Sequence, residues 1–326
     1  MRFLRRANAA LRAQPGQRRA RLETTLYTPG TLGRGGLAIQ EIAPESTDPA
    51  IDQWLEPHLV AFDARAATRN QLFLFLCGSH GQPARQRQIT ALAARMGYHA
   101  VNLRYPNAWT VGGLCRPTGD TGCHRKLRLE ILDGIDRTGL LRIGTANSID
   151  NRLTRLLRHL AHHEPDMDWA QFLGPDGIRW DKSLVAGHSQ GGGHAGIIGK
   201  EHEVLRVVMF AAPADYIESR AAHADWLALP GATPPERYFG FVHARDDGVE
   251  RILSAWELLG MAGAGPIVDV GHEGPPYRGS RRLISDLDDI PRAKFHSGIV
   301  HDNLTPTDAA GLPSYEPVWR YLLSTS

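Results

Sequence analysis

The fold of this chain is decided by the stretch SLVAGHSQGGG, residues 183–193. It contains the pattern Gly-x-Ser-x-Gly around Ser189, with an apolar strand expected before it and a helix after it. A turn from strand to helix within a few residues strains the backbone of the serine, and only small neighbours fit beside it. The serine oxygen then stands near the free N–H groups of a helix N-terminus, which favour negative charge. The pattern predicts that Ser189 is a catalytic nucleophile. The alternative, a turn that only packs closely, does not explain an exposed serine at its apex.

Strands and helices are expected to alternate on both sides of this stretch. The expected strands are 37–42, 58–62, 71–77, 100–105, 183–186, 205–211, 238–242 and 267–270, and the expected helices are 86–96, 152–163, 191–202, 250–259 and 315–323. This alternation predicts an α/β fold with a mostly parallel twisted sheet and helices on both faces. Two long insertions, 106–149 and 215–237, begin after strand ends, where such sheets keep their ligand sites. Tyr105, Trp109 and Trp226 are expected candidates for the wall of an acyl pocket there.

The charge is unevenly distributed. The 326 residues include 37 Lys+Arg and 35 Asp+Glu, which gives a net charge of +2. Residues 1–22 contain seven arginines and no acid, so the remainder carries −5. We expect a basic, disordered extension at 1–22, dispensable for activity, and a single domain at 23–326. The acidic body argues against nucleic-acid partners and against polyanionic substrates. No run approaches ~18 apolar residues, so no membrane span is expected.

The number and spacing of the cysteines indicate whether the chain binds a metal and whether it contains a disulfide. The three cysteines, Cys77, Cys115 and Cys123, lack the C-x₂-C pairs of zinc sites, so we expect no metal and no cofactor. Cys77 is expected to be a buried thiol. Cys115 and Cys123 flank a loop rich in proline and glycine and are expected to be reduced, with a disulfide as the alternative under oxidising conditions. The basic start lacks the apolar core of a secretory signal, which predicts a cytoplasmic location. Secretion is the alternative if translation starts elsewhere.

The elbow GHSQGGGHA at 187–195 resembles that of serine hydrolases of the α/β-hydrolase superfamily, closest to a bacterial group of esterases and more distantly to cutinases and lipases. The resemblance spans about residues 61–323 and includes LFLFLCGSHG, GYHAVNLRYPN, ATPPERYFGFVH and PVWRYLL. It implies the α/β-hydrolase fold and the chain order nucleophile, acid, base. It also implies a further strand near 282–286 before the base.

The resemblance places the acid after the strand at 238–242, where Asp246 and Asp247 both occur. We favour Asp247 because an apolar residue follows it by two places, as in the superfamily pattern, with Asp246 the alternative. The base is a histidine beyond the last strand. We favour His296, which a small residue follows, over His272, and expect His301 to be a loop residue.

The resemblance also implies that the backbone N–H groups of Ser79 and Gln190 form the oxyanion hole. The resulting hypothesis is a Ser189–His296–Asp247 esterase, independent of metals, that acts on a small-molecule or polymeric carboxylic ester. The alternatives are polyester or amide hydrolysis or acyl transfer with the same triad. A binding protein that kept the fold without catalysis is a further alternative.

Overall fold

The computed structural model describes residues 24–32, 35–288, 290–291 and 294–325. The expected extension at 1–22 lies outside these residues. Ten strands of the described chain form one sheet, in the order β1-β2-β3-β5-β4-β8-β9-β12-β14-β13. Their bounds are β1 Thr25–Leu26, β2 Leu37–Ile42, β3 His58–Asp63, β4 Leu72–Leu76, β5 His99–Leu103, β8 Ser183–His188, β9 Arg206–Phe210, β12 Tyr238–His243, β13 Val268–Asp269 and β14 Arg282–Ser285.

The sheet is mostly parallel. Only the pairs β2–β3 and β3–β5 are antiparallel among its described strands, and every pair from β5 to β13 is parallel. The central strands β4 and β8 are buried along their whole length, as the continuous apolar run at 72–76 predicts. The carboxyl ends of the parallel strands therefore meet at one edge of the sheet.

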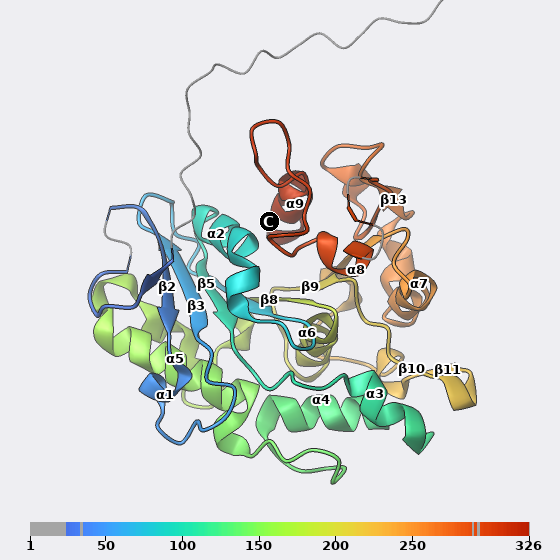
Figure 1. The fold of residues 1–326 in the computed structure, drawn as a ribbon, viewed down its shortest axis with the longest axis horizontal. Helices are drawn as coiled ribbons and strands as arrows, with labels where there is room; N and C mark the ends of the chain where they lie inside the picture. Colours follow the sequence, from blue (N-terminus) through green and yellow to red (C-terminus); the bar gives the residue numbers. More distant parts are fainter. Residues whose placement is uncertain (1–23, 33–34, 289, 292–293, 326) are drawn as a thin grey trace, which may run out of the picture.

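Helices cover both faces of the sheet (Figure 1). One face carries α2 and α9, which pack together, and the other carries α4, α5 and α6. The helix bounds are α1 Pro44–Thr47, α2 Arg87–Arg95, α3 Val111–Cys115, α4 Cys123–Asp133, α5 Ile149–His163, α6 Gln190–Glu201, α7 Val249–Leu258, α8 Phe295–Gly298 and α9 Glu316–Leu323. The α/β-hydrolase architecture expected from the sequence is thereby confirmed. None of the described helices is long and apolar enough to cross a membrane.

The two insertions contain regular structure. The first holds α3 and α4, and the second holds a short hairpin of β10 (Tyr216–Ile217) and β11 (Ala222–His223). A disulfide joins Cys115, at the end of α3, to Cys123, at the start of α4. The expectation of reduced cysteines is therefore wrong for this pair. The chain turns back between the two helices and brings the Cα atoms to 5.6 Å, within the range that a disulfide spans. Cys77 is free and buried, as expected.

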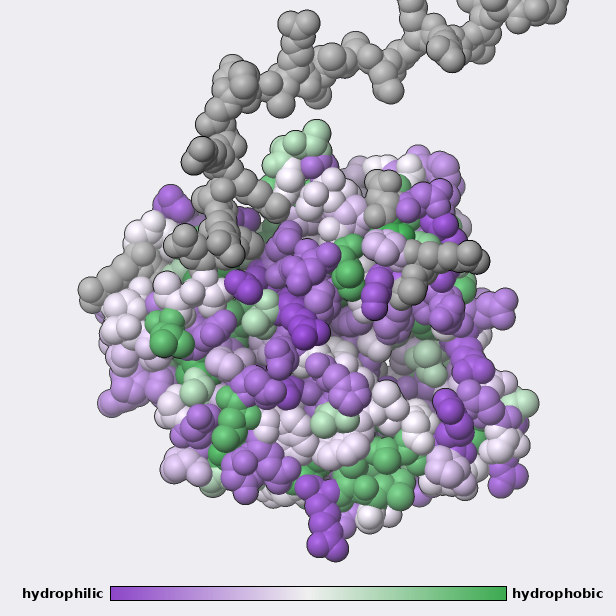
Figure 2. Space-filling view, in the orientation of Figure 1, coloured by the Kyte–Doolittle hydropathy of each residue, from purple (hydrophilic) through white to green (hydrophobic). Residues whose placement is uncertain are grey.

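The molecular surface is mainly polar on the face shown in Figure 2. Hydrophobic residues on this face gather in several separate groups rather than in one continuous area. Isolated groups of this kind are normal on protein surfaces.

Candidate active site

Ser189 lies at the sharp turn between β8 and α6. Its backbone has φ 54° and ψ −119°, in the region of positive φ that residues with a side chain rarely adopt. The turn is closed by very near backbone contacts, because a Cβ added to Gly191 would lie 2.0 Å from the carbonyl oxygen of Leu76. Gly191 therefore lets the start of α6 lie directly against the end of β4, and the positive φ of Ser189 makes this residue a candidate functional position.

His296 and Asp246 form a hydrogen-bonded pair. His296 Nδ1 lies 2.7 Å from Asp246 Oδ2. The Asp246 side chain is buried, and its other oxygen accepts a hydrogen bond from the N–H of Gly248 at 2.8 Å. Burial raises the pKa of Asp246, but the hydrogen bond from His296 and the charge of that ring outweigh it and hold the pKa below its usual value. An ionised carboxylate only accepts hydrogen bonds, so His296 Nδ1 is the donor and its Nε2 is the ring nitrogen that Asp246 does not occupy.

Asp247, the acid favoured by the sequence pattern, does not reach His296. Its side chain is exposed, whereas Asp246 is buried. The turn after β12 explains the difference: the Asp246 N–H donates to the carbonyl of His243, and the Asp246 carbonyl accepts from Val249 at the start of α7. These bonds direct the Asp246 side chain toward His296 and leave Asp247 facing solvent.

The ring of His188 forms a hydrogen bond with the backbone of His296. His188 is 5% exposed, and its Nε2 lies 2.8 Å from the carbonyl oxygen of His296. Burial, and to a smaller extent the neighbouring His296 ring, lower the pKa of His188 to about 3. The ring is therefore neutral at pH 7 and donates its Nε2 proton to that carbonyl. In the sequence, the only signal of this contact is the position of His188 next to Ser189.

The proposed oxyanion donors lie beside Ser189. Ser79 follows β4, and Gln190 is the first residue of α6. The Gln190 Oε1 atom accepts hydrogen bonds from the Ser79 hydroxyl and from the N–H of Val111, both at 3.0 Å, which ties the two segments together. Among the described residues, neither the N–H of Ser79 nor that of Gln190 has an acceptor. Both are therefore available to a developing oxyanion.

Two cavities meet at His296. The first measures about 140 Å³ and is lined by Ser79, Thr110, Val111, Gly112, Arg128, Ser189, Gln190, Ala211, Ala214, Asp215 and His296. The second measures about 230 Å³ and is lined by Ala214, Arg245, Asp246, Asp247, Gly248, Ile252, Phe295 and His296. No hydrogen bond joins Ser189 Oγ to the His296 ring within the described chain, yet both side chains line the first cavity. Catalytic hydrogen bonds are often long before substrate binds.

The aromatic residues expected to wall the pocket do not line it. Tyr105 is buried and donates its hydroxyl to the carbonyl of Cys77, and Trp109 packs edge-on against Trp54. Trp226 is buried and donates its indole N–H to Asp215. Sequence reasoning did not single out the lining residues Arg128 and Asp215. The only signal was that each of the two insertions begins after a strand end.

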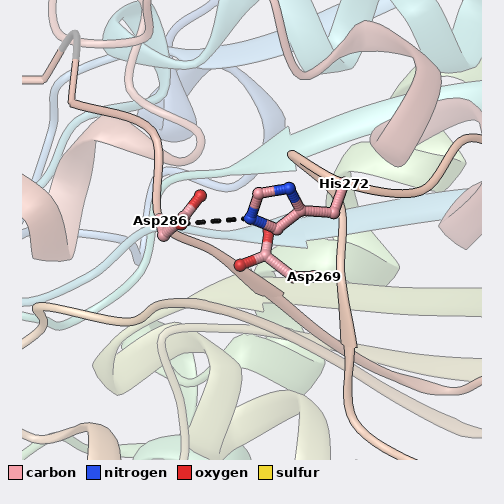
Figure 3. A group of neighbouring side chains, drawn as sticks. All are labelled: Asp269, His272 and Asp286. Atoms are coloured by element: carbon pink, nitrogen blue, oxygen red, sulfur yellow. Dashed lines mark ion pairs between the residues drawn. The ribbon is translucent and has the colours of Figure 1, made fainter. Parts of the chain in front are cut away.

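His272 belongs to a different cluster. Its Nε2 lies 3.5 Å from Asp286 Oδ2, and Asp269 completes the group (Figure 3). The three donor atoms lie within 4.8 Å of one another and are of the type that holds a divalent cation. The His272 and Asp286 side chains are 74% and 51% exposed, and neither lines a cavity with Ser189. His301 lies outside both cavities as well.

No known protein family and no curated protein matches this sequence. Solved structures are similar in fold. Esterase B from Lactobacillus rhamnosis, with a bound tributyrin phosphonate, is 12% identical with a TM-score of 0.47, over 89% of this chain and 87% of that one. A bacterial heroin esterase is 15% identical with a TM-score of 0.43, over 90% and 84%. An S-formylglutathione hydrolase from Agrobacterium tumefaciens is 14% identical with a TM-score of 0.43, over 84% and 95%. These likenesses concern the fold alone.

Proposed function

We propose that the protein is a serine hydrolase that cleaves carboxylic esters through a triad of Ser189, His296 and Asp246. The observation that carries the proposal is the 2.7 Å contact between His296 Nδ1 and Asp246, with Ser189 at a strained turn in the same cavity as His296. A base oriented by a buried carboxylate, next to a serine that lines the same cavity, is the arrangement that activates a serine hydroxyl.

The first half of the reaction acylates the serine. His296 Nε2 takes the hydroxyl proton as Ser189 Oγ attacks the ester carbonyl carbon. The carbonyl oxygen becomes an oxyanion and receives hydrogen bonds from the N–H groups of Gln190 and Ser79. The tetrahedral intermediate collapses by breaking the bond to the alcohol oxygen, which leaves with the proton held on His296. Asp246 stabilises the imidazolium throughout.

The second half releases the acid. Water gives a proton to His296 Nε2 and attacks the acyl carbon, and the same two N–H groups stabilise the second oxyanion. Collapse breaks the bond to Ser189 Oγ, which recovers its proton from His296. The cycle consumes one ester and one water and gives one alcohol and one acid. The small size of both cavities favours small-molecule esters over polyesters.

The test is the hydrolysis of p-nitrophenyl butyrate by Ser189→Ala. We expect kcat to fall by at least about a thousandfold, because the variant lacks the nucleophile, while circular dichroism and Tm stay unchanged. A fluorophosphonate should label the unmodified protein on Ser189 and fail to label the variant. Ser46→Ala, at an exposed serine of α1, serves as the control and should keep the full rate. A Ser189→Ala protein as active as the unmodified chain would refute the proposal.

A further inference from the structure

The cavity beside Ser189 is lined by a buried ion pair. Arg128, from α4, and Asp215, from the segment after β9, have side chains that are only 4% and 6% exposed. The contact is bidentate: Arg128 Nε donates to Asp215 Oδ2 at 2.8 Å, and Nη2 donates to Oδ1 at 2.6 Å. Trp226 Nε1 donates to the same carboxylate at 2.9 Å. Although burial raises the pKa of Asp215, the charge and hydrogen bonds of Arg128 outweigh burial and keep this pKa below the usual value.

Arg128 also touches the nucleophile turn. Its Nη1 donates to the carbonyl of Gln190 at 2.9 Å. Gly193 makes this approach feasible, because a Cβ there would lie 2.2 Å from Arg128 Nη2. A guanidinium has five N–H bonds. Three have acceptors among the described residues, so one N–H on each Nη is left for a molecule in the cavity.

Stability alone does not require charges in this place. A buried ion pair contributes little to stability compared with apolar residues of the same size, because both ions lose their hydration. The pair stands at the cavity of the nucleophile, where a charged donor and a charged acceptor side by side can select a ligand. This location points to recognition of substrate.

The first cavity lies on the acyl side of the ester. It contains both oxyanion donors, Ser79 and Gln190, together with Ser189, so the carbonyl must sit there. The second cavity shares His296 but contains neither donor. His296 protonates the leaving oxygen, so the alcohol extends into the second cavity. The Arg128–Asp215 pair therefore faces the acyl group.

We propose that Arg128 and Asp215 select a short acyl group that carries a hydroxyl, a proposal that rests on the ester hydrolysis proposed above. A hydroxyl can accept from the free N–H of Arg128 and donate to an Asp215 oxygen at the same time. A carboxylate gains less, because Asp215 already neutralises Arg128. The volume sets the length: with about 30 Å³ for each group the size of a water or methylene, 140 Å³ holds about four such groups.

The test compares p-nitrophenyl glycolate with p-nitrophenyl propionate, two esters that differ by a hydroxyl in place of a methyl group. Each kcat/KM is divided by the rate of alkaline hydrolysis of the same ester, which removes the difference in intrinsic reactivity. We expect the unmodified protein to favour glycolate by at least about tenfold, because propionate offers no hydrogen bond to the remaining N–H of Arg128 or to the Asp215 oxygen. The octanoate ester should be a poorer substrate than either, since its chain exceeds the cavity.

The variants separate recognition from folding. Arg128→Met combined with Asp215→Leu replaces the pair by apolar groups of similar size, a change that proteins tolerate better than loss of one partner. We expect the glycolate preference to fall to about one while a fluorophosphonate still labels Ser189. Should this variant fail to label, Asp215→Asn provides the same comparison with the carboxylate charge removed. Arg125→Met, on α4 in an exposed pair with Glu201, is the matched control and should keep the preference.

The outcomes are distinguishable from those for the proposed function. Equal corrected rates for both esters in the unmodified protein, or an unchanged preference in the double variant, would overturn the specificity proposal and leave ester hydrolysis intact. Absence of any hydrolysis that depends on Ser189 would overturn ester hydrolysis itself, and the specificity proposal with it.

Discussion

Two adjacent aspartates in this chain occupy opposite environments. Asp246 is buried against His296 and has a lowered pKa, whereas Asp247 is exposed. Both line the second cavity, so proximity to the site does not distinguish them. The distinction comes from hydrogen bonding, because only Asp246 accepts from the His296 ring. In the proposed mechanism, a carboxylate in that position fixes the histidine tautomer and stabilises the imidazolium that forms.

Replacement of these two residues should therefore have unequal effects. Asp246→Asn should lower kcat for p-nitrophenyl butyrate by about a thousandfold to ten-thousandfold, because an amide can impose the wrong tautomer on His296. Asp247→Asn should change kcat less than about threefold, since that side chain meets solvent. Both variants should keep the Tm of the unmodified protein within a few degrees. A larger loss of kcat in Asp247→Asn than in Asp246→Asn would contradict the assignment.

At the scale of elements, the sheet could be predicted from the sequence and the first insertion could not. A continuous apolar run such as 72–76 predicts a strand that is buried on both faces. The helix α4 lacks a clear apolar stripe because three polar residues, His124, Arg128 and Glu130, are buried on it. Tertiary partners such as Asp215 make this burial tolerable, and a single sequence does not show which residues will meet.

The residues of the candidate site differ in how far the sequence alone can locate them. Ser189 follows from a local motif, since strand, turn and helix are consecutive in the chain. Asp246 and His296 are 50 residues apart, and the one-residue choice between Asp246 and Asp247 depends on the turn after β12. Which of two adjacent residues faces the site is set by hydrogen bonds that form only in the folded chain. The disulfide could not be predicted for the same reason, because its formation depends on how closely the ends of α3 and α4 approach each other in the folded chain.

Loss of the disulfide should loosen the first insertion. In the chain-entropy account, a bridge between residues eight apart stabilises by about 2–3 kcal/mol. Cys115→Ser combined with Cys123→Ser should thus lower the Tm by several degrees. The kcat/KM should fall too, since α3 and α4 carry Val111 and Arg128 into the cavity.

Dithiothreitol provides the control for this prediction. It should lower the Tm of the unmodified protein toward that of the double variant and leave the variant unaffected. Mass spectrometry reports whether the bond is reduced. A fully reduced protein with an unchanged Tm would show that the bridge does not stabilise the insertion.

The whole molecule contains several neutral buried histidines. His58, His188 and His194 are at most 5% exposed, and burial lowers the pKa of each of them. The unfolded chain binds a proton at each of these rings below about pH 6.5, and the folded chain does so only at much lower pH. The free energy of unfolding therefore decreases as pH falls below 6.5. Asp150 opposes this trend, because burial raises its pKa to about 7 and the folded form binds the extra proton.

The buried histidines outnumber Asp150, so acid causes a net loss of stability. His159 adds to this loss, because burial and the neighbouring histidines lower its pKa to about 4. A group that is protonated in only one of the two states changes the free energy of unfolding by at most about 1.4 kcal/mol per pH unit, so the histidines together outweigh Asp150 between pH 6.5 and 5. Calorimetry should show a Tm lower by several degrees at pH 5 than at pH 7. His194→Leu should reduce this dependence, since neither ring nitrogen of His194 has a hydrogen-bond partner among the described residues. A Tm that is constant over this range would mean that these rings are not held neutral by burial.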